Sequence, residues 1–210
     1  MKHDSLIFDL DGTLWDSTEK CARAYNLGLE RMGLPVLRKV TASDIASVTG
    51  LPFDQCVSTL FPEISQNDFE RLIHQISAAK REIILVEGGR IYPGVKEGLK
   101  RLSRYFQLFL VSNCQRWYMD FFLSWSGFKS LFMDQESHGN TGKTKAENIA
   151  AIISRNRLSS PVYIGDTASD HASAMAAGIR FIHLNHGFGD PVDGVLSLDN
   201  FDKLVDYLLS

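Results

Sequence analysis

Four short, almost wholly apolar runs, spaced widely along the chain, constrain the fold more than any other feature. They are LIF at 6–8, LFLV at 108–111, VYI at 162–164 and FIHL at 181–184. Strands without an alternating polar face are typical of a parallel sheet that is covered on both sides. Stretches with apolar residues at helical spacing lie at 94–105, 144–156 and 168–178. This order predicts an α/β fold, with a Rossmann-like parallel sheet core flanked by helices.

Residues 16–89 break this rhythm and predict an inserted helical domain. Two helical stripes run through them, Cys21–Tyr25–Gly28–Met32 and Phe69–Leu72–Ile73–Ile76, without a convincing strand. Asp16 with Glu19 resembles a capping box that would start the first helix. The pair Gly88-Gly89, followed by Pro93, indicates a flexible connection back to the sheet. We therefore expect a core domain of residues 1–15 and 90–210 and a helical domain of residues 16–89.

Charge and composition exclude several classes of partner. The 210 residues carry a net charge of −3, from 22 basic and 25 acidic side chains, with no long block of one sign. We therefore expect no binding to nucleic acid or to an anionic membrane. The longest apolar runs are too short for a signal peptide or a transmembrane helix. Three cysteines without a CxxC spacing are typical of a reducing compartment, so we expect a cytoplasmic protein.

Polar residues follow the apolar runs where a parallel sheet would place a ligand. Asp9, Asp11, Gly12 and Thr13 follow the first run. Ser112-Asn113 follows the second, and Gly165-Asp166-Thr167, with Asp170, follows the third. Ligands of open α/β sheets bind at the carboxyl ends of the strands, so these side chains would converge if the strands are neighbours.

The acids at these ends have two possible interpretations. Asp-Gly is a common turn pair, so Asp11-Gly12 could simply close a strand. Alternatively, Asp9, Asp11, Asp166 and Asp170 surround a cation, because four carboxylates in one pocket repel one another without one. Oxygen ligands suit Mg²⁺, which often binds together with a phosphate. Ser112 and Thr13 could hold phosphate oxygens, and Lys143 or Lys145 could supply the positive charge that such a site needs.

The set of motifs resembles the haloacid dehalogenase (HAD) superfamily of phosphohydrolases. FDLDGTLWDS is similar to the DxDGT first motif of that family, and LVSN is similar to its hydroxyl-bearing second motif. A lysine before a helix resembles the third motif, and IGDTASD resembles the GDxxxD fourth motif. The resemblance covers residues 6–170 in order, which makes it far more specific than a single DxDG.

The resemblance implies a role for each motif residue. Asp9 would attack phosphorus and become an aspartyl phosphate, and Asp11 would act as general acid and base. Mg²⁺ would be held by Asp9, Asp166 and the backbone carbonyl of Asp11, with Asp170 completing or orienting that shell. Substrate phosphate would be bound by the remaining motif residues: Thr13, Ser112, Asn113 and a lysine.

The third motif departs from the family pattern, because TGKTKAENI has no proline after a lysine. Two lysines therefore compete for the phosphate. We favour Lys145 over Lys143, because Lys-Ala-Glu-Asn-Ile resembles the start of that helix in close relatives. The lysine that does not bind phosphate would be a charged side chain in solvent.

The helical insert resembles the C1-type cap of phosphoglycolate phosphatase-like and β-phosphoglucomutase-like members. Such a cap implies a small phosphorylated metabolite as substrate. Thr49-Gly50-Leu51 is either a cap turn facing the site or a simple turn between helices.

Other polar and aromatic residues have structural interpretations. His183 and His186 lie three positions apart without further metal ligands nearby, so we expect structural or surface roles for them. His171 follows Asp170 and could line the edge of the site, but we favour a role outside it. Cys114 is not needed as a nucleophile, since Asp9 fills that role. Trp15 could touch substrate or line the hinge of the cap. An aromatic stripe at helical spacing predicts core packing in preference to a dimer face: Trp117, Phe121, Phe122 and Trp125.

The predicted function is therefore a Mg²⁺-dependent phosphatase that hydrolyses a small phosphomonoester through an aspartyl phosphate, as a monomer or a homodimer. A phosphomutase of the β-phosphoglucomutase type shares all four motifs and differs in the cap. A non-catalytic binding module on the same fold is the third alternative, which the presence of every motif acid disfavours.

Overall fold

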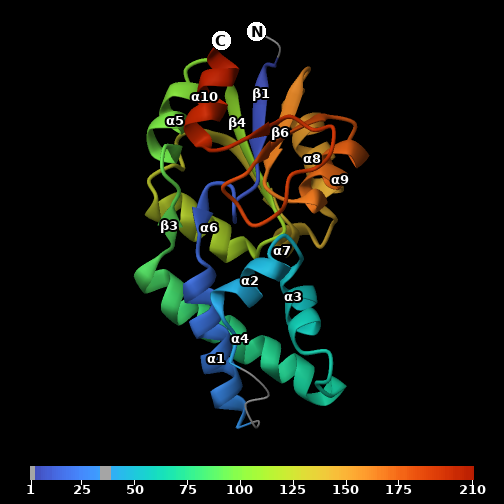
Figure 1. Ribbon diagram of the computed structural model, residues 1–210. Coiled ribbons are helices and arrows are strands. Elements are labelled where there is room, and N and C mark those ends of the chain that lie inside the picture. The colour runs from blue at the N-terminus through green and yellow to red at the C-terminus, as the bar shows by residue number, and fades with distance from the viewer. Residues whose placement is uncertain (1–2, 34–38) are drawn as a thin grey trace. The chain divides into compact units, whose positions relative to one another are not determined.

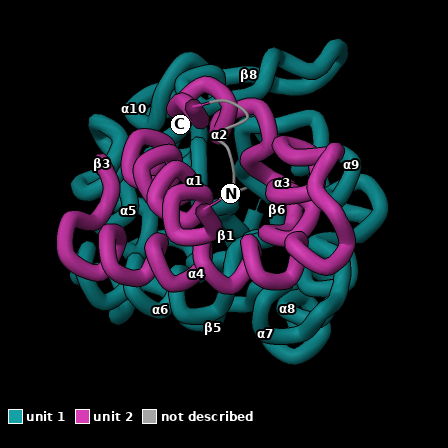
Figure 2. Tube along the Cα trace, turned by 90° about the horizontal axis from the view of Figure 1, so that it is seen from below, with its two compact units in different colours: residues 1–16, 91–210 teal, residues 17–90 magenta. Residues whose placement is uncertain are grey.

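A computed structural model describes residues 3–33 and 39–210. The chain divides into two compact units (Figure 2). The first unit comprises Met1–Asp16 and Ile91–Ser210, and the second comprises Ser17–Arg90. Each unit is described by itself below.

The first unit is built on a six-stranded sheet in which all described pairings are parallel. In spatial order the strands are β5 (Phe132–Ser137), β4 (Gln107–Ser112), β1 (Ser5–Phe8), β6 (Pro161–Gly165), β7 (Arg180–Leu184) and β8 (Ser197–Leu198). Phe8 is in register with Leu110 on one side and with Ile164 on the other. The predicted α/β class is thus confirmed, and all four apolar runs are strands of this sheet.

The strands are apolar on both faces because helices cover both faces (Figure 1). Successive side chains of a strand point to opposite faces. Ile7 belongs to a buried cluster with Ile149 of α8 (Lys145–Asn156) and Ala174 of α9 (Ala168–Ala176). Phe8 faces the other way, and its ring stacks on Phe201 of α10 (Phe201–Leu209) at 5.9 Å between centroids. Helix α10 packs in turn on α5 (Val95–Leu102).

Strands that follow β1 in the chain lie on both sides of β1 in the sheet. From β1 the chain proceeds to β4 and β5, then returns through α7 (His138–Thr141) and α8 to β6. The direction of the connections therefore reverses between β1 and β6. Such a switch point is where open α/β sheets bind ligands, beyond the carboxyl ends of the strands.

The aromatic stripe lies on α6 (Arg116–Trp125), and its predicted core packing is confirmed for Phe122 and wrong for Trp125. Phe122 is fully buried, but Trp125 is 42% exposed, and Trp117 and Phe121 are half-buried. The buried face of α6 is formed by Tyr118, Met119, Phe122 and Leu123. An aromatic-rich helix has apolar residues on more than one face, so spacing alone did not identify the face that packs.

The second unit is the predicted helical insert. It contains α1 (Thr18–Met32), α2 (Ala42–Val48), α3 (Phe53–Leu60) and α4 (Gln66–Glu87), and no strand occurs at 17–33 or 39–89. Helices α1 and α4 cross closely at Gly28, where a Cβ atom would lie 2.7 Å from Cγ1 of Ile76. Arg31 and Glu82 pair across the same two helices at 2.7 Å. Residues 49–51 form the turn between α2 and α3, with Gly50 at φ 98°.

The predicted capping box of Asp16 and Glu19 is wrong. Helix α1 begins at Thr18 with Ser17 at the N-cap, and the Ser17 side chain makes no capping hydrogen bond. Asp16 belongs instead to the short strand β2 (Trp15–Asp16), which pairs with β3 (Arg90–Ile91). An acid one residue before a hydroxyl matches the capping pattern, but extended pairing of Asp16 excludes it from the cap.

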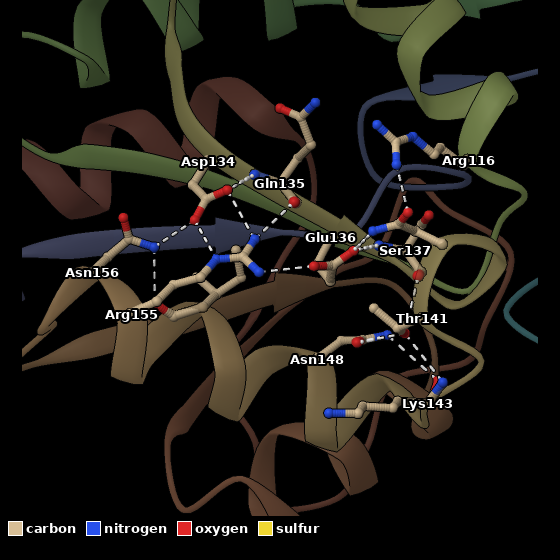
Figure 3. A network of polar contacts seen from close by, with 12 residues as sticks. Arg116, Asp134, Gln135, Glu136, Ser137, Thr141, Lys143, Asn148, Arg155 and Asn156 are labelled. Carbon is tan, nitrogen blue, oxygen red and sulfur yellow. Dashed lines mark hydrogen bonds and ion pairs between the residues drawn. The ribbon is translucent and has the colours of Figure 1, made fainter.

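An ionic network fixes edge strand β5 to the last turn of α8 (Figure 3). The guanidinium of Arg155 donates to both oxygens of Asp134, at 2.6 and 2.8 Å, and to Glu136 at 2.8 Å. Glu136 also accepts a hydrogen bond from Asn140 of α7 at 2.8 Å. The network therefore connects β5 to both helices that follow it, including the helix that begins at Lys145.

Arg155→Ala is expected to lower the free energy of unfolding by about 1–3 kcal/mol, because it leaves Glu136 buried without its charged donor. Burial raises the pKa values of Asp134 and Glu136, but hydrogen bonds from Arg155 outweigh it and lower both. Their contribution is therefore present at neutral pH and is lost as the pH falls below about 4. Denaturant unfolding between pH 7 and about pH 3 should show a steeper acid loss for wild type than for the variant.

Lys100→Ala is the matched control for this experiment. Lys100 pairs with Glu97 at 3.1 Å on the exposed face of α5. Removing such a surface pair should cost less than about 1 kcal/mol. Equal losses in the two variants would contradict a stabilising role for the network at β5.

Candidate active site

Three buried carboxylates meet at the switch point. Asp9 directly follows β1, Asp166 directly follows β6, and Asp170 lies in the first turn of α9. Each offers one oxygen, and the three oxygens lie within 4.8 Å of one another. The three residues are at most 2% exposed. The structure thus brings together three of the four acids predicted to surround a metal.

The position of Asp9 follows from strand pairing. Its backbone N–H donates to the carbonyl of Ile164 at 2.9 Å, which continues the β1–β6 ladder by one residue. Asp9 therefore emerges from the sheet where β1 and β6 separate, beside Asp166. The hydroxyl of Tyr163 lies beneath it, donating to the carbonyl of Val111 at 2.8 Å and lying 3.5 Å from Asp9 Oδ1.

Crowding perturbs the protonation of these acids. Burial, with the neighbouring Asp170, raises the pKa of Asp9 to about 7 in spite of the opposing effect of Lys145. Burial, with Asp170 and Asp9, also raises the pKa of Asp166 well above its ordinary value. A cation among the carboxylates would stabilise their ionised forms, so metal binding and proton release are linked here. An all-oxygen, acidic donor set fits a hard divalent cation such as Mg²⁺.

The buried amine of Lys145 places a positive charge among the carboxylates. Its Nζ lies 2.9 Å from Asp9 and 2.6 Å from Asp170, and the side chain is 1% exposed. Burial alone would lower the pKa of Lys145, but Asp170 and Asp9 outweigh it and raise the pKa, which keeps the amine charged. A capping box of Thr144 and Glu147 starts α8 and fixes Lys145 as the first residue of the helix.

Lys143, the competing lysine, is not brought to the carboxylates. It is exposed, and the hydrogen bonds recorded for it involve its backbone. Its carbonyl accepts hydrogen bonds from His138 and Asn148, and its N–H donates to Thr141. Lys143 thus shapes the turn before α8, whereas Lys145 enters the cluster.

Asp170 acts mainly as an anchor. Its Oδ2 accepts hydrogen bonds from the hydroxyl of Thr167 at 2.7 Å and from the N–H groups of Thr167 and Asp166. Its Oδ1 accepts from Lys145. Asp170 therefore orients both the lysine and the loop that carries Asp166.

Asp166 lies in a cradle that excludes side chains. Its carboxylate accepts hydrogen bonds from the Thr13 hydroxyl at 2.9 Å and from the Phe188 N–H at 2.8 Å. A Cβ atom added at Gly12 or Gly187 would lie 2.1 or 2.2 Å from atoms of Asp166. Gly12 also has φ +87°, which favours glycine. The predicted DxDGT motif therefore supplies both an acid and the space for a second acid.

Asp11 is not part of the cluster of three carboxylates. Its Oδ1 accepts hydrogen bonds from the Tyr118 hydroxyl at 2.5 Å and from the Trp15 indole N–H at 3.0 Å. Trp15 is fully buried, and it lies in β2, two residues before the second unit begins at Ser17. Asp9 and Asp11 thus have different hydrogen-bond partners.

Ser112 and Asn113 lie at the carboxyl end of β4, next to β1. Ser112 ends the strand, is buried, and is in register with Ser137 of β5. Its hydroxyl accepts a hydrogen bond from the Cys114 N–H at 3.4 Å. The second motif therefore reaches the same edge of the sheet as Asp9.

Two histidines, His183 in β7 and His186 two residues after that strand, donate hydrogen bonds to the loops of the site. The Nε2–H group of His183 donates to the carbonyl of Asp166 at 2.9 Å. That of His186 donates to the carbonyl of Thr13 at 3.1 Å, and its ring stacks on Tyr92. Burial lowers the pKa of His186. Both histidines thus have structural roles, and His171, on α9, contacts Phe181.

Tyr118, Tyr163 and Phe188 are functional neighbours that sequence reasoning missed. Tyr118 lies 107 positions from Asp11, and Phe188 contributes only a backbone N–H to Asp166. Only Tyr163 had a signal in the sequence, because it lies in an apolar run that leads directly into a motif.

Comparisons with known proteins agree with this geometry. Residues 6–184 match the haloacid dehalogenase-like hydrolase family. The chain is 29% identical over 201 residues to a phosphoglycolate phosphatase of Aliivibrio fischeri, covering 89% of this chain and 87% of the relative. It is 26% identical over 218 residues to a phosphoglycolate phosphatase of Photobacterium profundum, covering 96% of this chain and 93% of the relative.

A solved structure shares the fold. A haloacid dehalogenase-like hydrolase of Streptococcus pneumoniae superposes with a TM-score of 0.83 at 19% identity, covering 99% of both chains. No helix among residues 3–33 and 39–210 has the length and apolar character needed to cross a membrane. With the family match spanning most of the chain and its acids gathered at the switch point, the protein belongs to the haloacid dehalogenase-like hydrolase family.

Proposed function

We propose that this HAD-type phosphatase hydrolyses a small phosphomonoester through a covalent phosphate on Asp9. The observation that carries the proposal is the buried group of Lys145, Asp9 and Asp170 beside Asp166. An amine at 2.9 Å from a carboxylate provides positive charge where a phosphoryl group would meet its nucleophile. No simple structural role requires so many charges to be buried at the ligand-binding edge of a sheet.

Mg²⁺ is the metal we assign to the site. Asp9, Asp166 and the backbone carbonyl of Asp11 would hold it, and Asp170 would orient that group through Lys145 and the Asp166 loop. When bound there, Mg²⁺ would neutralise the crowded carboxylates and polarise a phosphoryl oxygen.

The residues of the chain then divide the reaction between them. A carboxylate oxygen of Asp9 attacks phosphorus, and the bond from phosphorus to the substrate ester oxygen breaks. Asp11 gives its proton to that ester oxygen, which leaves as an alcohol. Asp11 then takes a proton from a water molecule, which attacks the phosphorus and releases Asp9 and inorganic phosphate. Lys145, Ser112, Asn113 and Thr13 bind the phosphoryl group, Thr13 also holding Asp166.

The substrate is a small phosphorylated metabolite, and phosphoglycolate is the first candidate. Two relatives that cover most of the chain are named phosphoglycolate phosphatases. We assign residues 16–89 as the cap that determines which leaving group is accepted, and residues 1–15 and 90–210 as the catalytic core.

Phosphate release is expected to depend on a divalent metal. Chelation with EDTA should lower turnover by at least about 100-fold, because the metal contributes several kcal/mol to charge stabilisation. Mg²⁺ should restore it. The assay measures inorganic phosphate from phosphoglycolate, glycerol phosphates, hexose phosphates and p-nitrophenyl phosphate. Turnover that survives EDTA would contradict the metal assignment, and isomerisation of a hexose phosphate without phosphate release would identify a mutase instead.

A further inference from the structure

The carboxyl group of Asp11 is held by two donors, one four residues away in the sequence and the other 107 residues away. The hydroxyl of Tyr118, in α6, and the indole N–H of Trp15, in β2, both donate to Oδ1, at 2.5 and 3.0 Å. Two donors on one oxygen restrict the rotation of the carboxyl group about its own axis. Tyr118 lies outside the four motifs, and Trp15 lies two residues after the DxDGT residues of the first motif.

Both donors are rigidly placed. Trp15 is fully buried and Tyr118 is 2% exposed. Their rings meet edge to face at 5.1 Å between centroids, and the Trp15 ring also packs on Phe122 at 5.0 Å. Aromatic side chains in such contacts have few accessible rotamers. Trp15 and Tyr118, which we call the Asp11 platform, are therefore part of the hydrophobic core of the first unit.

The platform is separate from the groups that hold Asp9. Lys145 and Tyr163 contact Asp9, whereas Trp15 and Tyr118 contact Asp11. The nucleophile and the proton-transferring acid thus have different supports. A change in Trp15 or Tyr118 should therefore affect proton transfer to the leaving group and leave the Asp9 nucleophile in place.

We propose that Tyr118 is a positioning residue that, together with Trp15, holds the Asp11 carboxyl group in line with the leaving oxygen. The proposal rests on the proposed function, in which Asp11 protonates that oxygen as its bond to phosphorus breaks. Proton transfer needs the acid within hydrogen-bond reach of its target, so small errors in placement are costly. The proposal assigns a role in the reaction to a residue outside the four motifs.

Tyr118→Phe tests the proposal through its dependence on the leaving group. An alkoxide leaves poorly without a proton, whereas p-nitrophenolate leaves readily without one. The value of kcat/KM reports the steps up to alcohol release, so it excludes the later attack of water on the intermediate. We expect Tyr118→Phe to lower kcat/KM about 10-fold or more for phosphoglycolate, a fraction of what a general acid supplies. For p-nitrophenyl phosphate the loss should be less than about 3-fold.

A merely structural role of Tyr118 would give a different pattern. Equal losses with the two substrates, or no loss with either, would overturn the proposal. Tyr105→Phe is the control, because it removes the same hydroxyl from a residue that is 56% exposed and lies two residues before β4. It should leave both kcat/KM values unchanged. Thermal unfolding of Tyr118→Phe would establish that the variant folds.

Asp9→Asn separates this proposal from the proposed function. If Asp9→Asn keeps its activity, the proposed function is wrong. If activity needs Asp9 but Tyr118→Phe affects both substrates equally, only the positioning role is wrong.

The indole N–H resonance of Trp15 gives a readout that needs no turnover. The protein contains three tryptophans, so three such resonances are expected in a ¹⁵N-labelled sample. Trp117→Phe and Trp125→Phe would assign the remaining one to Trp15. Both Asp11→Asn and Tyr118→Phe should shift it, because each alters the acceptor that the indole contacts. An unchanged Trp15 resonance in Asp11→Asn would overturn the proposal independently of any activity.

Discussion

Asp9→Asn is expected to abolish phosphate release, with a loss of at least about 10⁴-fold in kcat. An amide oxygen is a poor nucleophile, and no other described carboxylate directly follows β1 at the switch point. The variant should also fail to accumulate acid-stable radioactivity from a ³²P-labelled substrate, since no acyl phosphate can form. Phosphate release and rapid acid quenching measure the two effects separately.

The fold of Asp9→Asn should be intact, because asparagine has nearly the same shape and can still accept a hydrogen bond from Lys145. Burial already disfavours the charge of Asp9, since it raises the pKa of this carboxyl to about 7. Asp120→Asn, at an exposed position on α6, provides the same chemical change as a control. Wild-type activity in Asp9→Asn would exclude hydrolysis through a phosphorylated Asp9.

Lys145→Met should damage both catalysis and stability. Loss of the amine removes the charge that would stabilise the transferring phosphoryl group, and we expect kcat to fall by about 10²–10³-fold. It also leaves Asp9 and Asp170 buried without their partner. Removing one partner of a buried ion pair typically costs about 3–5 kcal/mol, so the free energy of unfolding should fall by that order.

The stability loss in Lys145→Met should depend on pH. Without the amine, the pKa of Asp9 rises further above the value in the unfolded chain, so the folded state holds a proton more tightly. Stability then decreases as the pH rises. Denaturant unfolding should therefore show a smaller difference between variant and wild type at about pH 5 than at about pH 8.

Lys143→Met is the matched control, because Lys143 is exposed two residues away and its recorded hydrogen bonds use its backbone. It should change kcat less than about 2-fold and the free energy of unfolding by less than about 0.5 kcal/mol. If Lys143→Met instead proved the more damaging variant, the assignment of the site lysine would be reversed.

The sequence predicted the sheet where strands are apolar on both faces and failed where they are not. All four apolar runs are strands. Strand β5, FMDQES, was missed because four of its six residues are polar, two of which bind Arg155, and its second apolar residue, Met133, is exposed. Strands β2, β3 and β8 contain two residues each, which is too short for any period to be seen.

The residues of the candidate site also fall into a group that the sequence predicted and a group that it missed. Asp9, Asp166, Asp170 and Lys145 could be brought together from the sequence, because each follows a strand or starts a helix at one edge of the sheet. The environment of Asp11 could not, because Tyr118 reaches it only through the orientation of α6. Helical spacing on α6 showed an apolar helix but not which side chain would turn toward β2.

The glycines around Asp166 limit how this enzyme could change over evolution. At Gly12 and Gly187 the obstacle to a side chain is the Asp166 carboxylate itself, at 2.1 and 2.2 Å from the added carbon. Even alanine would have to displace the acid, so neither position can serve as a starting point for a new specificity. Gene libraries randomised at these two codons should return mostly inactive clones. Diversity in substrate choice must then arise from positions at which a larger side chain displaces only solvent.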